Sequence, residues 1–249
     1  MSMKENAKAI AENVPKVYEA GELAGIKNKS LWRAIQRSSA DATNATEAKT
    51  DASYMFYGFD TACLYPQYDI KPTKAYAFAR DMVGENIDLV ERLAKCGVSM
   101  DFGNCKNVTY AFYQCKFSRL PELDFRNAGT TTQYLIFGGQ VVTVDKLILS
   151  ESGANCSRTF DYANSLKNIV VEGVIGAVSN VGLQYCKKLT LASAKSILTA
   201  LEDVSGTERA GLYIVSLSPE TTALLEADGA TAPNGLTWLE YVSAKGWLL

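Results

Sequence analysis

The residue types that most often perform chemistry in proteins are unevenly represented in this sequence. Histidine is absent, which excludes Ser-His-Asp and Cys-His catalysis, HExxH zinc sites and histidine-based metal triads. Phosphate-binding and nucleophile-elbow motifs of the GxxxxGK[ST], GxGxxG and GxSxG types do not occur. An enzyme built on this chain would therefore depend on carboxylate, lysine, tyrosine or thiolate chemistry.

Two pairs of carboxylates are the candidate catalytic groups. A glycosidase needs two carboxyl groups held about 5 to 9.5 Å apart. The candidates are Asp88 with Glu91 and Glu202 with Asp203. Both pairs are more typical of a solvated face. We therefore expect no catalytic residue, no metal site and no cofactor.

The cysteines are not spaced as metal ligands or as a redox pair. No CxxC occurs, so neither a zinc ribbon nor a thioredoxin-like site fits the sequence. The chain is long and apolar enough to form a core without disulfide bonds, so we expect buried, reduced thiols, with disulfides as the alternative. The six residues are Cys63, Cys96, Cys105, Cys115, Cys156 and Cys186.

Composition is that of a soluble globular protein. The 249 residues are 47% hydrophobic and 21% charged, which suits one large domain or two small ones. A net charge of -2 gives no reason to expect nucleic acid as a partner. We expect no membrane insertion, because no apolar run is long enough, and no secretory signal in residues 1–18.

Residues 1–52 are expected to form a helical segment followed by a linker at 38–53. Apolar residues spaced 4, 3, 4 and 3 apart form a seam that is typical of helix association, and its β-branched members favour a trimer. Pro15 interrupts the helix, so an amphipathic helix packed on its own domain is the alternative to an oligomerising stalk. The seam residues are Met3, Ala7, Ile10, Val14 and Val17.

From residue 98 onward the sequence repeats about every 24 residues. Phe112, Ile136 and Phe160 recur in phase. Strand-like runs occur at 98–102, 120–125, 144–149 and 168–172, and one short strand per turn of this length is typical of leucine-rich repeats. Such turns stack into a solenoid with a parallel sheet. Small residues also recur in one packing position: Cys115, Gly139, Ala163 and Cys186.

Helices and a further strand are expected around these repeats. The segment 81–95 has the pattern of a helix with Val83, Ile87, Val90 and Leu93 facing inward, and it ends at Cys96 and Gly97. Beyond residue 188 the predicted elements are a helix at 192–201, a strand at 211–217, a helix at 219–227 capped by Ser218, and a helix at 236–244.

Residues 111–120 (AFYQCKFSRL), echoed at 159–166 (TFDYANSL), resemble the BspA-like class of leucine-rich repeats. The segments 12–21 (ENVPKVYEAG) and 65–72 (YPQYDIKP), with Trp238 and Trp247, are similar to proteins of Gram-positive phages and prophages, including tail and baseplate proteins. The resemblance implies an α/β leucine-rich-repeat solenoid with short parallel strands, an N-terminal helical segment and an α/β C-terminal cap. The expected boundaries are 1–52, 53–188 and 189–249.

Exposed aromatic and polar side chains are the candidate ligand-binding residues. The aromatic cluster at 54–68 could stack on sugars or carry a protein interface, but we favour the alternative that it closes the open end of the repeats. The candidates are Tyr54, Tyr57, Tyr65, Tyr68, Arg119, Arg126 and Tyr134.

The resemblance implies a non-enzymatic component of a phage particle, made in the bacterial cytoplasm. Its N-terminal segment would bind other virion proteins and form a homo-oligomer, and its solenoid would bind a host-surface glycan or protein. A bacterial leucine-rich-repeat interaction protein or adhesin is the alternative, and a carbohydrate-active enzyme is a third possibility.

Overall fold

The computed structural model describes residues 50–64, 66, 69–229 and 231–249, and these form an α/β fold of short parallel strands and four helices. The strands are β1 (Thr50–Asp51), β2 (Pro72–Lys74), β3 (Ile87–Asp88), β4 (Phe117–Asp124), β5 (Thr143–Ile148), β6 (Asn168–Glu172), β7 (Val181–Leu183) and β8 (Val215–Leu217). The helices are α3 (Leu89–Cys96), α4 (Leu191–Thr199), α5 (Pro219–Ala227) and α6 (Trp238–Ala244), and two 3-10 turns lie at Thr61–Cys63 and Gly129–Thr131. None of these helices has the length and apolar character that a membrane crossing requires.

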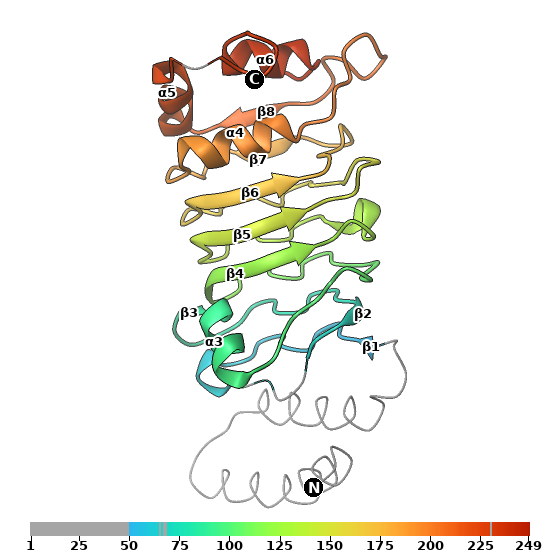
Figure 1. The fold of residues 1–249 in the computed structure, drawn as a ribbon, viewed down its shortest axis with the longest axis vertical. Coiled ribbons are helices and arrows are strands. Elements are labelled where there is room, and N and C mark those ends of the chain that lie inside the picture. Colours follow the sequence, from blue (N-terminus) through green and yellow to red (C-terminus); the bar gives the residue numbers. More distant parts are fainter. Residues whose placement is uncertain (1–49, 65, 67–68, 230) are drawn as a thin grey trace, which may run out of the picture.

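The main sheet has the order β3-β4-β5-β6, and every neighbouring pair is parallel. Arg119 pairs with Thr143, and Thr143 pairs with Asn168. The strands lie one above another in Figure 1, with α3 toward one end and α4, α5 and α6 toward the other. The predicted strands at 120–125, 144–149 and 168–172 are therefore confirmed to within a few residues.

Two predictions before β4 are wrong. Residues 98–102 form no strand, because only Met100 makes an isolated bridge, to Ile70. The helix predicted for 81–95 starts later, at Leu89, because Asp88 accepts a hydrogen bond from the Glu91 N–H and so acts as its N-cap. Gly97 ends this helix with a φ of 66°, as the sequence indicates.

Of the four residues predicted to face inward, only Leu93 is buried. Leu89 and Leu93 are buried, whereas Val83 is 50% exposed and lies before the helix. Because α3 starts six residues after Val83, the helical periodicity assigned to 81–88 does not apply there.

The linker expected at 38–53 is likewise wrong at its described end, since Thr50–Asp51 pairs with β2.

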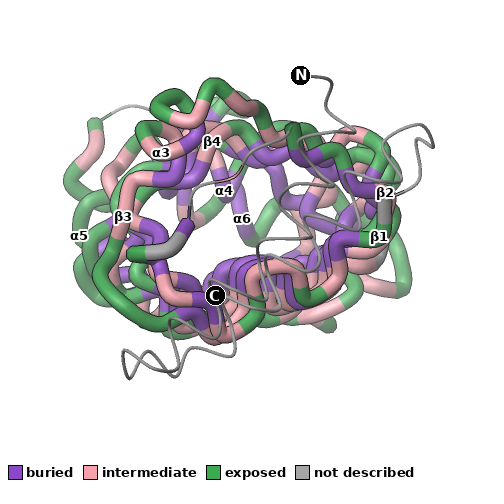
Figure 2. The backbone as a smooth tube through the Cα atoms, turned by 90° about the horizontal axis from the view of Figure 1, so that it is seen from below, coloured by how far each residue is buried: buried purple, intermediate pink, exposed green. Residues whose placement is uncertain are grey.

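A second set of stacked segments forms the wall opposite the main sheet. The N–H of Tyr110 donates to the Gln133 carbonyl at 3.1 Å, and the N–H of Tyr134 donates to the Ser157 carbonyl at 2.9 Å. The two walls enclose the core, and Figure 2 shows the buried residues on the inner side of the looping chain.

Aromatic rings and small residues fill this core as the repeat pattern predicts. Phe112 is fully buried, and its ring centroid lies 5.9 Å from that of Phe78 and 6.0 Å from that of Phe102. The repeated small residues Cys115, Gly139, Ala163 and Cys186 are all buried.

The cysteine side chains that the structure describes are free thiols. Four are buried and Cys96 is partly exposed. Burial raises the pKa of Cys115 and Cys156 to about 12, so both stay protonated at neutral pH. The prediction of buried, unpaired thiols is therefore confirmed for Cys105, Cys115, Cys156 and Cys186.

Beyond residue 188 the predicted helices form close to their expected positions. Thr190, Ser218 and Thr237 cap α4, α5 and α6, and Thr237 forms a capping box with Glu240. The strand expected at 211–217 is shorter and begins at Val215. The C-terminal residues pack back on this region, because the Trp247 indole N–H donates to the Glu202 carbonyl at 2.9 Å.

Candidate binding surface

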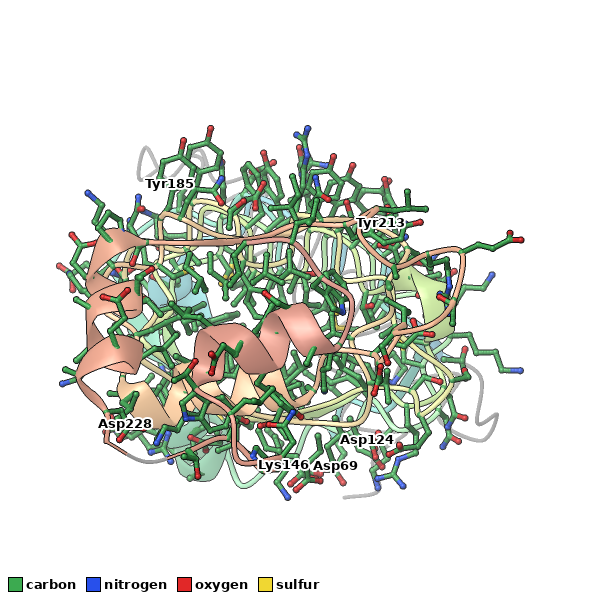
Figure 3. The ribbon with its side chains drawn as sticks, turned by 90° about the horizontal axis from the view of Figure 1, so that it is seen from above. Asp69, Asp124, Lys146, Tyr185, Tyr213 and Asp228 are labelled. Carbon is green, nitrogen blue, oxygen red and sulfur yellow. The ribbon has the colours of Figure 1, made fainter. Side chains whose placement is uncertain are left out.

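A continuous group of aromatic side chains covers the wall opposite the main sheet. Figure 3 shows Tyr185 on this side, whereas Lys146 of β5 and Asp124 of β4 lie on the opposite side. Ring contacts link the other members to Tyr185 turn by turn. We call this group the aromatic face: Tyr54, Tyr57, Tyr76, Arg80, Tyr110, Tyr113, Tyr134, Phe137, Arg158, Tyr162 and Tyr185.

A repeated backbone turn positions these side chains. Two residues four apart have left-handed φ angles, for example 61° at Tyr110 and 47° at Gln114, which few non-glycine residues adopt. Between them Phe112 is buried in the core and Tyr113 is partly exposed. The same pair of left-handed residues recurs at Tyr54 and Gly58, Ala77 and Asp81, Tyr134 and Gly138, and Arg158 and Tyr162.

The first column of rings runs through four tyrosines. The Tyr54 and Tyr76 ring centroids are 5.4 Å apart, and those of Tyr76 and Tyr110 are 5.7 Å apart, both edge to face. Tyr110 and Tyr134 are stacked at 4.7 Å. The guanidinium of Arg158 lies 5.7 Å from the Tyr134 ring centroid and extends the column into the next turn.

The second column runs parallel to the first and contains stacked rings. Tyr113 and Phe137 lie 4.9 Å apart with an interplanar angle of 2°. Phe137 lies 5.2 Å from Tyr162, which stacks on Tyr185 at 4.3 Å and 14°. Each such pair stabilises the fold by about 0.5–1.5 kcal/mol beyond the area that it buries.

Arg80 takes the place of a ring in the second column. Its guanidinium lies 4.7 Å from the Tyr113 ring centroid, 5.0 Å from that of Tyr110 and 6.0 Å from that of Tyr57. Its Nε also bonds Asp81 at 3.0 Å. The cation is therefore held among three rings and one carboxylate, and it joins the two columns.

The outer edges of the columns remain accessible to a partner. Tyr54, Tyr57 and Tyr162 are 42%, 44% and 46% exposed. The pKa of Tyr110 is raised, mainly by burial, and that of Tyr185 is raised, mainly by its hydrogen bond with Tyr162. These two phenols are consequently neutral at physiological pH and keep a hydroxyl that can donate or accept.

The outward side of the main sheet is charged instead of aromatic. We call this group the sheet face: Arg119, Glu122, Asp124, Arg126, Asp145, Lys146, Val170 and Glu172. Arg119 binds Asp145 through two hydrogen bonds of 2.7 and 3.0 Å. Lys146 lies 3.0 Å from Glu172, and Arg126 lies 2.9 Å from Asp124.

The candidate catalytic carboxylates all have local partners. Asp88 caps α3, and Glu91 pairs with Lys95 at 2.7 Å. Glu202 binds Arg209 and accepts the Ala177 N–H at 2.7 Å. In the described part of the chain no group of three or more His, Cys, Asp or Glu residues could hold a metal ion.

The candidate binding residues fall on two sides of the molecule. Tyr54, Tyr57 and Tyr134 belong to the aromatic face, whereas Arg119 and Arg126 lie on the sheet face in ion pairs. Tyr65, Tyr68 and the seam residues Met3, Ala7, Ile10, Val14 and Val17 lie outside the described residues.

The structure also divides the aromatic cluster that was expected to close the end of the repeats. Phe59 is only 3% exposed and belongs to the core, whereas Tyr54 and Tyr57 are on the surface. Most of the aromatic face was not singled out from the sequence. Its signal is a tyrosine or phenylalanine that follows the buried apolar residue in some of the turns, as Tyr113 follows Phe112 and Phe137 follows Ile136.

Comparisons with known family models, curated proteins and solved structures found no match to this chain.

Proposed function

We propose that this chain is a non-enzymatic binding protein that presents its aromatic face to a ligand on the host cell surface. The two ring columns carry this proposal. Tyrosine supplies a large amphipathic contact area at low entropic cost, and tyrosine and arginine are enriched where binding energy concentrates. Stacking fixes the rings before a partner arrives, so less side-chain entropy is lost on binding.

The sheet face is the weaker candidate for this role. Arg119 and Lys146 already have carboxylate partners. A ligand that used these charges would have to displace existing ion pairs, which reduces the net gain. The exposed rims of Tyr57 and Tyr162 bear no such cost.

We further propose that the fold is a leucine-rich-repeat-like solenoid in a phage particle. The 24-residue register between β4 and β5 and the recurring left-handed turns support the repeat. The likeness of residues 12–21 to phage tail and baseplate segments supports the virion location. Residues 1–52 would attach the protein to other virion proteins and form a trimer.

Trimerisation would increase the strength of attachment without new contacts. Linked copies raise the effective concentration of the second and third binding sites, so weak individual sites give avid binding. This arrangement suits a repetitive cell surface.

A binding titration on intact host cells tests the aromatic face. Combining Tyr57→Ser with Tyr162→Ser removes two exposed rims and should weaken binding at least about tenfold. The matched control is Val170→Ser, which replaces an apolar residue of similar exposure on the sheet face. Equal binding of the double variant and the wild type, with unchanged melting, would contradict the proposal.

The virion location needs a separate experiment. Mass spectrometry of gradient-purified particles should find the chain at a fixed ratio to capsid and tail proteins, and light scattering of the full chain should give the mass of a trimer. A monomer that stays with the cell fraction would contradict both the location and the trimer.

A further inference from the structure

Tyr185 ends the second column and differs from the rings within it. One ring face stacks on Tyr162 at 4.3 Å, and no ring or cation in the described part of the chain contacts the other face. Phe137, by contrast, has Tyr113 on one side and Tyr162 on the other. Rings inside the column therefore offer their edges to a ligand, whereas Tyr185 is partly exposed and, among the described residues, has another ring on one face alone.

The sequence position of the column also changes at this end. In the earlier turns the ring lies three residues after the first left-handed residue, as Tyr113 follows Tyr110. In the turn that begins at Arg158 this place is taken by Asp161, and the ring moves one residue on to Tyr162. Gln184 and Tyr185 repeat this polar-then-aromatic order one turn later. The last two turns thus add polar groups beside the stacked pair.

No donor among the described side chains bonds the oxygens of these polar groups. In the part of the chain that the structure describes, the buried Gln184 Oε1 atom has no hydrogen-bond partner. The half-buried carboxylate of Asp161 has neither a salt bridge nor a side-chain hydrogen bond there. A Cβ at Gly182 would clash with Asp161 Oδ1 and lie 3.1 Å from Gln184 Oε1. Both acceptor oxygens therefore lie beside Gly182, close to where a side chain at that position would begin.

The charged residues around the stacked pair of Tyr162 and Tyr185 restrict the charge of a ligand that can bind there. Arg158 is close enough to lower the pKa of Asp161, although burial raises that pKa more. Lys187 and Lys188 follow Tyr185 directly and are exposed. A cationic ligand would be repelled by these three residues, and an anionic group would bring no hydrogen for the two acceptor oxygens. A neutral ligand rich in hydroxyl donors avoids both costs.

We propose that Tyr185, Asp161 and Gln184 form a subsite for a neutral pyranose of a cell-surface glycan. The inference rests on the proposed function and names its ligand. The apolar CH face of the sugar would pack on the face of Tyr185 that points away from Tyr162. Its hydroxyl groups would donate to Asp161 and supply the hydrogen that Gln184 Oε1 lacks.

Binding of the full chain to protein-free walls of the host tests this subsite, with intact and periodate-oxidised walls as probes. The wild type should bind intact walls and lose binding after periodate. Tyr185→Ala should bind at least about tenfold more weakly, whereas Tyr185→Phe keeps the ring and should stay within about threefold. Asp161→Ala removes an acceptor without touching the ring and should also weaken binding about tenfold. Lys187→Ala is the neighbouring control and should bind as the wild type does.

The outcomes separate this inference from the function on which it rests. Binding to intact cells that is lost after protease and absent on protein-free walls overturns the sugar subsite but keeps the aromatic face as a protein-binding surface. Unchanged wall binding by a folded Tyr185→Ala or Asp161→Ala variant overturns the subsite as well. No binding to either cells or walls overturns the proposed function too.

Discussion

The aromatic face and the sheet face are built on the same stacked turns, yet different interactions hold their side chains. On the aromatic face Tyr113 stacks on Phe137 and Arg80, and ring contacts continue from turn to turn. On the sheet face Arg119 and Asp145 form an ion pair with side chains 45% and 31% exposed. Ring stacking resists salt, whereas exposed ion pairs are screened by it.

This difference indicates which face can bind a partner at little cost in free energy. The ion pairs of the sheet face satisfy each other, and a partner must compete with them. The aromatic face is ordered by its own stacking and still exposes hydroxyls and ring edges. The charged side chains of the sheet face are therefore mostly paired with one another. The rings of the aromatic face are ordered but still exposed to a partner.

A substitution in the shared core should lower the free energy of unfolding more than a substitution on either face. Phe112 is fully buried against Phe78 and Phe102, so Phe112→Ala should cost about 3–5 kcal/mol of unfolding free energy through lost burial and a cavity. Chemical denaturation measures this. A loss below about 1 kcal/mol would show that the two faces do not depend on this core.

The next largest effect should fall on the aromatic face. Tyr113→Ala removes one stacked ring and one cation–π partner of Arg80, and should cost about 1–2 kcal/mol. The control is Arg119→Ala on the sheet face, whose unfolding midpoint should stay within measurement error. If the two variants are equally destabilised, the columns do not stabilise the fold as described.

The ion pair between Glu202 and Arg209 is better shielded than those of the sheet face, and its contribution to stability should depend on pH. Burial would raise the pKa of Glu202, but hydrogen bonds from Arg209 and Ala177 lower it below its ordinary value of 4.5. A lowered folded-state pKa stabilises the protein above the unfolded-state pKa, and this contribution is lost as the pH falls through the folded-state pKa.

Glu202→Gln should therefore cost about 1 kcal/mol at pH 7, a figure kept small by solvent screening. The difference from the wild type should shrink below about pH 4. Melting curves at several pH values measure it. A difference that grows toward acid pH would have the wrong sign for this ion pair.

The smallest effect should be the coupling between Arg119 and Asp145. A double-mutant cycle should find a weak coupling in low salt that disappears in about 1 M salt, since the Debye length is then about 3 Å. The same cycle on Tyr113 and Phe137 should be insensitive to salt. A salt-dependent aromatic pair would contradict the contrast between the faces.

Much of the fold follows from the sequence because the repeat is periodic. The register between β4 and β5 follows from apolar residues spaced 24 apart, and Ser218 marks the start of α5 through its capping side chain. The errors lie where local patterns compete. Residues 81–88 have apolar spacing that suits a helix, but Asp88 caps Glu91, so the helix begins after them.

The candidate surface was harder to predict than the fold. Tyr54, Tyr57 and Tyr134 were identified from type and exposure, but a sequence does not show that a ring stacks on the next turn. Asp161 and Gln184 were missed for a related reason. Both lie near Gly182, and this proximity becomes visible only when the turns are stacked.

A labelling footprint on bound cells tests the central claim most directly. Tetranitromethane modifies exposed tyrosines such as Tyr57 and Tyr162, and a carbodiimide modifies carboxylates of the sheet face such as Glu122 and Glu172. Site-resolved mass spectrometry compares the free and the cell-bound protein. We predict that the tyrosines become protected while the carboxylates react as before. Protected carboxylates with unprotected tyrosines would place the ligand on the sheet face and contradict the account.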